Sequence, residues 1–361
     1  MRRLPPYLIG TGLILFVVNQ PNQPLMNVML ISNLGLLLIY LGIMWSISKI
    51  KNIRELTLGS RWVYIPLLII VASIIISSLM SGASNKFALA LFAPTLFALY
   101  VLGRYYGEVI FKPFLYGVII VSTSLVIGGI INPGIKQGGL ISPTNYDMAT
   151  GFLVFGALVC VWKKQRWWIT TIALVGLFFT GAEEAMFAVA VVCLTILIRR
   201  DWSKRLLLPI AVVLLCLVIA TPLGVIGKLY ESVSGRVEDA TEGNWLQATG
   251  YRLTGNWMLS DLEPFGTGYY VSWDDDYIGK IPHNVPLIIV EQIGIAGALA
   301  WCVVAGYCLI KTKWKYAWIG LLSLCVFDHF IWSMCAPWFW VLAGVSTASD
   351  IKNDYIFKNE R

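Results

Sequence analysis

The chain has 361 residues, of which 58% are hydrophobic and only 13% are charged. Soluble globular proteins average about 25% charged residues, so the composition excludes a set of ordinary soluble domains and favours one membrane domain over residues 1–361. In a soluble protein the net charge of +7 would suggest a nucleic-acid partner. In a membrane protein an excess of basic residues is expected in the cytoplasmic loops, and this accounts for the positive net charge. No nucleic-acid partner is therefore expected.

Apolar segments that could form transmembrane helices recur along the whole chain. A helix needs roughly 20 apolar residues to cross the hydrocarbon core of a bilayer. These segments lie near residues 7–18, 25–48, 62–80, 87–103, 109–131, 147–162, 167–180, 182–198, 205–226, 285–310, 315–330 and 334–348. The sequence therefore predicts an all-α polytopic membrane protein of about 12 transmembrane helices; because several segments are short, about 11 also fits.

The positions of lysine and arginine predict how these spans are oriented. Cytoplasmic loops of membrane proteins carry an excess of basic residues. With twelve spans and a cytoplasmic N-terminus, all but six of the 27 lysines and arginines fall on the cytoplasmic side. The six on the outer side are Lys86, Lys136, Lys228, Arg236, Arg252 and Lys280. Both termini are therefore predicted to lie in the cytoplasm.

The longest polar segment, residues 228–284, is predicted to be a large extracytoplasmic loop before the tenth span. Loops of this length are often functional. Its middle, residues 244–259, mixes aromatic and aliphatic side chains with polar ones, which is typical of short amphipathic helices on a membrane or over a cavity. The run Asp274-Asp275-Asp276 offers hard oxygen ligands for a divalent ion, but three consecutive acids cannot all converge on one ion. A solvated acidic turn is favoured, and no metal site is predicted.

The two histidines of the chain both fall on the predicted outer side. His283 closes the large loop, and His329 follows Asp328 at the outer end of the eleventh span. Histidine titrates near neutral pH, so an imidazole at the boundary between water and membrane can accept a proton from a hydroxyl group. A structural role is the alternative for each.

Two outer arginines are candidates for binding an anion. Arg236 and Arg252 persist on a face that is normally poor in basic residues, and a guanidinium group suits bidentate pairing with a diphosphate. Ion pairs with Glu238 or Asp261 are the structural alternative. Glu291, about two turns into the tenth span, is a further candidate because acids at membrane depth are costly. An interhelical hydrogen bond would also explain it.

Three stretches follow one another in the C-terminal third of the chain. The first is Arg252, Trp257 and the run Pro264-Phe265-Gly266-Thr267-Gly268-Tyr269. The second is His283, Asn284, Leu287, Glu291, Gly294 and Gly297. The third is Asp328, His329, Phe330, Trp332, Phe339, Trp340 and Gly344. In this order, and with one long outer loop before the last spans, they resemble the O-antigen ligase and O-antigen polymerase family of bacterial envelope glycosyltransferases.

The resemblance implies an inverting glycosyltransferase that uses a glycan carried on a polyprenyl diphosphate, such as undecaprenyl diphosphate, at the outer face of the bacterial plasma membrane. It implies no metal and no cofactor. His283 would be the general base, and Arg252 with Arg236 would offset the charge of the departing diphosphate. The supporting residues would be Asn284, Glu291, Asp328 and His329. The acceptor would be another lipid-linked repeat, which defines a polymerase, or a different glycan or lipid, which defines a ligase of lipopolysaccharide type. For a polymerase the resemblance also implies a partner that controls chain length.

One stretch departs from the family pattern. Many members have an arginine after the Thr-Gly that opens the eighth span, but here Glu183 and Glu184 follow Thr180-Gly181-Ala182.

The alternative function, from another class of protein, is a transporter or lipid-sugar flippase that carries out no chemical reaction. Such proteins typically show paired halves, broken helices and ionisable groups near the membrane midplane. This sequence shows no similarity between its halves.

Overall fold

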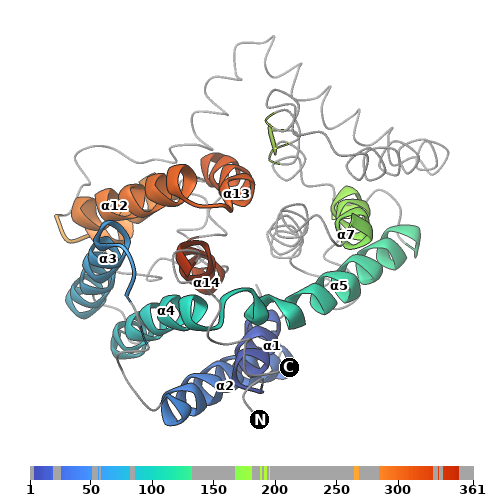
Figure 1. Cartoon of the computed structure of the whole chain (residues 1–361), viewed down its shortest axis with the longest axis horizontal. Coiled ribbons are helices and arrows are strands. Elements are labelled where there is room, and N and C mark those ends of the chain that lie inside the picture. Colours follow the sequence, from blue (N-terminus) through green and yellow to red (C-terminus); the bar gives the residue numbers. More distant parts are fainter. Residues whose placement is uncertain are drawn as a thin grey trace, which may run out of the picture.

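The structure, a computed structural model, describes most of the N-terminal third and of the C-terminal fifth of the chain, with shorter pieces between them. The described residues are 4–18, 26–50, 56, 58–81, 86–131, 167–180, 188, 191, 192, 195, 264–267, 284–327, 332 and 336–348. All regular secondary structure in these residues is helical (Figure 1). The all-α prediction is thus confirmed for this part of the chain.

The described helices coincide with the apolar segments of the sequence. They are α1 (Leu4–Val18), α2 (Met26–Lys49), α3 (Arg61–Met80), α4 (Lys86–Tyr106), the 3₁₀ helix η2 (Gly107–Phe111), α5 (Lys112–Ile131), α7 (Trp167–Thr180), α12 (Val285–Lys311), α13 (Lys315–Phe327) and α14 (Ala336–Thr347). Each lies within a few residues of a predicted span. The predicted spans 147–162 and 205–226, most of 182–198 and most of the large loop lie outside the described residues.

Several of these helices are suited to a membrane. Among the described residues, α3 and α12 are long and apolar enough to cross one, and a third span is added if the bent pair Phe92–Phe111 and Leu115–Gly128 counts as one. Large apolar side chains on the outside of the bundle include Met44, Met80 and Ile310, which are 66%, 66% and 74% exposed. Such surfaces are unusual on soluble monomers. Some helices could therefore span a membrane, while the total of twelve spans stays a prediction.

The connection between α4 and α5 differs from the expected reversal between two spans. The helix axes meet at an angle of 57°, and Figure 1 shows the two helices as one bent row. Tyr106 and Lys112, on either side of η2, both have right-handed helical backbone angles. Between them Gly107, the first residue of η2, has a left-handed φ of +55°. The chain bends at this 3₁₀ connector without folding back on itself.

Two of the last three helices, α12 and α14, run parallel to each other. Trp301 in the middle of α12 stacks on Phe339 of α14, with ring centroids 5.8 Å apart. Nearer the start of α12, Gln292 accepts a hydrogen bond from Trp332, which lies just before α14. Contacts thus advance along α12 and α14 in the same sense. This agrees with the predicted topology, in which the tenth and twelfth spans cross in one direction and α13 returns between them.

The helix α14 is the centre of the described bundle. Every one of its residues is buried, and Figure 1 shows it between α12 and α4. Gly103 of α4 and Gly344 of α14 bring the two backbones together, because a β-carbon at Gly103 would lie only 2.7 Å from the carbonyl oxygen of Val341. Small residues at a helix crossing permit this approach in membrane proteins. A helix that is apolar all round in this way belongs in an interior.

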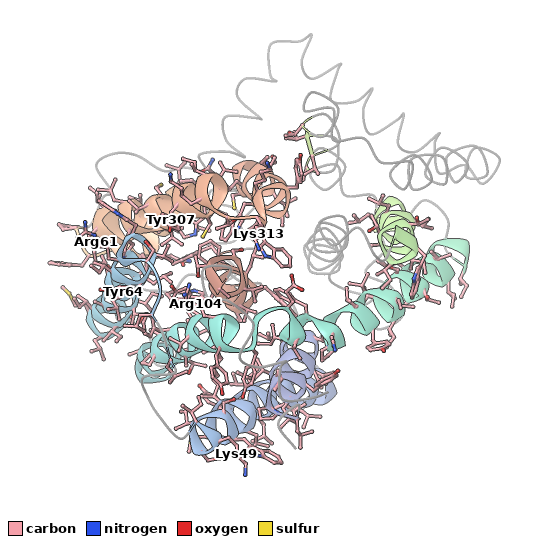
Figure 2. All side chains as sticks on the ribbon, viewed as in Figure 1. Lys49, Arg61, Tyr64, Arg104, Tyr307 and Lys313 are labelled. Atoms are coloured by element: carbon pink, nitrogen blue, oxygen red, sulfur yellow. The ribbon has the colours of Figure 1, made fainter. Side chains whose placement is uncertain are left out.

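Basic residues gather at one end of the bundle. There Tyr106, at the end of α4, donates a hydrogen bond of 2.9 Å to Ser46 of α2, and Tyr100 donates one of 2.7 Å to the carbonyl of Leu58 before α3. This end, called the basic end below, carries Lys49, Arg61, Arg104, Lys112, Lys311, Lys313 and Lys315, some of which Figure 2 labels. Lys86 starts α4 at the opposite end.

Arg104 is the buried charge of the basic end, with 5% of its surface exposed. Its Nη1 donates a hydrogen bond to the carbonyl oxygen of Thr347, the last residue of α14. Figure 2 shows Arg104 between α4 and α14. Gly59, with φ of +77°, packs against the guanidinium, and a β-carbon there would lie 2.9 Å from Nε. A cation at a helix C-terminus satisfies a free carbonyl and opposes the negative end of the helix dipole.

Candidate functional site

Only two of the predicted site residues fall in the described part of the chain. They are Asn284 and Glu291, at the start of α12 and two turns into it. The predicted base His283, the predicted diphosphate ligands Arg252 and Arg236, and the supporting residues Asp328 and His329 lie outside the described residues. The roles of these five residues stay predictions.

Asn284 is the N-cap of α12. Its backbone is extended, with φ of −129° and ψ of 117°, and its Oδ1 accepts a hydrogen bond of 3.3 Å from the backbone N–H of Leu287. Pro286 follows within the first turn, where a missing N–H costs nothing. An asparagine at this position satisfies one of the free amides of a helix start. Asn284 therefore determines where α12 begins, one residue after His283.

The helix α12 is broken at Gly294. This residue has φ of 76° and ψ of 176°, so the helix is divided into two segments, residues 285–293 and residues 295–311. The first is called the outer segment below, after the side on which the sequence predicts it. That backbone conformation is essentially restricted to glycine, because any β-carbon is strained there. The break also frees backbone groups of the preceding turn, which need partners elsewhere when they are buried.

The turn at residues 264–267 supplies those partners. The backbone N–H of Thr267 donates a hydrogen bond of 2.7 Å to the carbonyl oxygen of Glu291, and Thr267 Oγ1 donates a second one of 3.2 Å to the same oxygen. Gly266 is buried, with φ of +74°, and a β-carbon on it would overlap the peptide between Gln292 and Ile293. A β-carbon on Gly294 would overlap the carbonyl oxygen of Pro264. Each glycine thus makes room for the backbone of the other segment.

A third segment reaches the same turn of α12. The Nε1–H of Trp332 donates a hydrogen bond of 2.8 Å to Oε1 of Gln292. Both side chains are buried, with 2% and 4% of their surfaces exposed. Inside a protein such a polar bond is strengthened by the low dielectric constant, and its loss is costly. Residues 264–267, 291–294 and Trp332 are called the Gly294 junction below.

The Gly294 junction joins the three stretches that the sequence singled out. The first stretch contributes residues 264–267, the second residues 291–294, and the third Trp332. Glu291 takes part through its backbone carbonyl; its half-buried carboxylate keeps its supporting role as a prediction. Gln292 was missed by the sequence analysis. The signal was present, because an amide within an apolar helix at membrane depth needs a partner.

Metal binding was not predicted for the chain. In the residues that the structure describes, no group of three or more His, Cys, Asp and Glu side chains could hold a metal ion. The acidic run at residues 274–276 lies outside them.

The described part of the protein is thus an all-helical bundle with apolar helices that could span a membrane, and a broken helix joins its three motif stretches at one end. Comparison of the chain with protein-family models, with curated proteins and with solved structures gives no match. The resemblance to the O-antigen ligase and polymerase family therefore stays a prediction that depends on the motifs.

Proposed function

We propose that this protein is an integral membrane glycosyltransferase that polymerises or ligates glycans carried on polyprenyl diphosphate. In this proposal twelve helices cross the bacterial plasma membrane, both termini lie in the cytoplasm, and the reaction takes place at the outer face. The substrates are a polyprenyl-diphosphate-linked glycan and a glycan or lipid acceptor. No metal and no cofactor take part.

The convergence of the motif stretches is the observation that carries the proposal. Residues 264–267 and Trp332 are 68 to 65 positions apart in the chain, yet both contact the same turn of α12. Residues that serve one site are expected to lie together in the fold even when they are far apart in the chain. Residues on the three stretches that lie outside the described part, His283 above all, are joined to this junction by short lengths of chain.

The charge distribution supports the proposed sidedness. The basic end of the bundle lies at the opposite end of α12 from the Gly294 junction, at a distance of about 25 Å for the segment 295–311, since an α-helix rises about 1.5 Å per residue. Basic residues favour the cytoplasmic side. The junction then lies toward the outer face, where the lipid-linked substrate of the proposed reaction is presented.

The proposed chemistry needs a base and a counter-charge. The acceptor hydroxyl loses its proton as its oxygen attacks the anomeric carbon, and His283 takes that proton. The bond from the anomeric carbon to the diphosphate oxygen breaks, and the polyprenyl diphosphate departs with the bonding electron pair. Arg252 and Arg236 offset the negative charge that collects on this leaving group. Asn284 fixes the start of α12 next to the base.

A substitution of the base tests the proposal. In membranes supplied with a polyprenyl-diphosphate oligosaccharide, His283→Ala should lower glycan transfer by about 10²-fold or more, because general-base catalysis contributes about 10² to 10⁴. Lys313→Ala, which removes an exposed lysine at the basic end, is the matched control and should keep full activity. Chelator should have no effect on the wild type. Equal activity of His283→Ala and wild type would contradict the assignment of the base.

A second candidate function is favoured by one observation. Broken helices are typical of secondary transporters, where they line the substrate site, and α12 is broken at Gly294. A flippase of lipid-linked sugar would move its substrate across vesicle membranes and leave it covalently unchanged. Product analysis separates the two functions, because only the transferase releases free polyprenyl diphosphate.

A further inference from the structure

We infer that Gly266 and Gly294 form a backbone lock that positions the proposed catalytic base, with the Trp332–Gln292 hydrogen bond as its brace. This inference rests on the proposed function, because it assigns positioning residues to the same site. None of these residues needs to touch substrate. They act by holding the turn at residues 264–267 and the outer segment of α12 in one arrangement.

The lock depends on backbone conformations at Gly266 and Gly294 that residues with a β-carbon rarely adopt. Gly294 has a backbone conformation open to glycine alone, and Gly266 has φ of +74°. Each glycine faces the backbone of the other segment: the β-carbon position of Gly294 lies 2.9 Å from the carbonyl carbon of Pro264. The two segments therefore dock only because neither carries a side chain at the point of contact.

Hydrogen bonds make the docked arrangement specific. The carbonyl of Glu291, three residues before the break, accepts hydrogen bonds from the N–H and the hydroxyl of Thr267. In a membrane a carbonyl cannot turn to water, so undocking of the turn would cost these two hydrogen bonds without replacement by solvent. The docked state is therefore favoured wherever α12 is embedded.

The lock controls the direction of the outer segment of α12. Residues 285–293 span about 13 Å at 1.5 Å per residue, and a rotation at Gly294 would swing their far end, where Asn284 and then His283 follow. The chain that carries Arg252 leads into the lock at Pro264, twelve residues further on. The junction therefore sets the direction in which the chain leaves α12 toward the proposed base. A misplacement of about 1 Å at a reacting centre can cost about 10²-fold in rate.

The first experiment compares two glycine substitutions on the same helix. Gly294→Ala should open the lock, whereas Gly306→Ala is the matched control, because nothing lies within 4 Å of a β-carbon there. Amide hydrogen exchange of the purified full-length protein reports the lock without any need for activity. Exchange of the Thr267 amide, which bonds the carbonyl of Glu291, should rise at least tenfold in Gly294→Ala and stay within twofold of wild type in Gly306→Ala. Unchanged exchange in Gly294→Ala would overturn the lock.

Transfer kinetics then test the positioning role. Gly294→Ala should lower kcat at least tenfold with KM for the lipid-linked glycan within about twofold, because positioning of the base affects the chemical step more than binding. A loosened loop with unchanged kcat would overturn the positioning role. The exchange result stands even if His283→Ala is as active as wild type, a result that would contradict only the proposed function.

Milder variants keep the inference testable if Gly294→Ala does not fold. Trp332→Phe keeps the ring but removes the donor, and Gln292→Met keeps the volume but removes the acceptor. Each should lower kcat about threefold, and the double variant should lose no more than either single variant, because both remove one bond. Losses that multiply in the double variant would overturn the brace.

Discussion

The two ends of the bundle are held together by different means. At the basic end a buried guanidinium, that of Arg104, closes α14 through the carbonyl of Thr347, and Gly103 and Gly344 let two helices touch. At the Gly294 junction a broken helix, a turn and an indole interlock mainly through backbone atoms. The basic end joins the ends of several helices, the connector η2 among them, whereas the junction interrupts a single helix within its length.

This difference separates stability from positioning. Interactions between intact helices add to the free energy of unfolding and are spread over long surfaces. Strained backbone conformations cost free energy and persist where the surrounding structure holds them, often at functional sites. We therefore expect changes at the basic end to act mainly on stability and changes at the junction mainly on activity.

The largest expected effect is all-or-none and concerns sidedness. In a variant with all native cysteines replaced, Phe265→Cys should react with a membrane-impermeant maleimide on intact cells, since this side chain is 53% exposed at the junction. Lys313→Cys, exposed at the basic end, should react only after permeabilisation. Labelling of both cysteines from the same side would contradict the placement of the two ends on opposite sides of the membrane.

The bend between α4 and α5 can be tested in the same assay. Gln137→Cys lies in the segment after α5 and should be labelled from outside if α4 and α5 are two spans. Labelling only after permeabilisation would show that the pair with its 57° bend crosses the membrane once.

The next effect is on stability at the basic end. Arg104→Ala should lower the free energy of unfolding by about 2 to 3 kcal/mol, because it removes a buried charged hydrogen-bond donor and leaves the carbonyl of Thr347 without it. Arg61→Ala, which removes an exposed arginine stacked over Trp62, should change it by less than about 0.5 kcal/mol. The midpoint of thermal unfolding in detergent measures both. A fall in the specific activity per folded molecule of Arg104→Ala would contradict the expectation that the basic end acts mainly on stability.

The smallest effect concerns the cap of α12. Asn284→Ala should cost about 1 kcal/mol of stability, and Asn284→Ser should restore most of it, because serine is also a good N-cap. The same unfolding assay measures this. If the side chain acts on substrate and not only as a cap, Asn284→Ser will be as inactive as Asn284→Ala although its stability is restored.

Helix positions followed from the sequence because they depend on local properties. Apolar length predicts where α3 and α12 begin and end to within a few residues. The gathering of Lys311 and Lys313 with Arg61 at one end also agrees with the prediction from charge alone. Between α4 and α5 the chain bends by 57° at η2, where Gly107 has a φ of +55°, a local conformation that apolar length does not predict.

The candidate site could be predicted only as separate pieces. Gly266 and Gly294 were visible as parts of motifs. Their backbone angles, however, depend on the segment that packs against each of them, and the two glycines are 28 residues apart in the chain. Gln292 carried no motif at all. The burial of Arg104 was likewise hidden, because a basic residue at a span end is normally exposed to the cytoplasm.

By itself the sequence determined that the described chain forms apolar helices, roughly where they lie, and which end of the bundle is basic. These properties are sums over neighbouring residues. The tertiary structure alone decided that α12 breaks at Gly294, that the turn at residues 264–267 fills the break, and that Arg104 closes α14. The physical reason is that a buried carbonyl or a left-handed glycine is tolerated only beside its partner, and the partner is chosen by packing between distant segments.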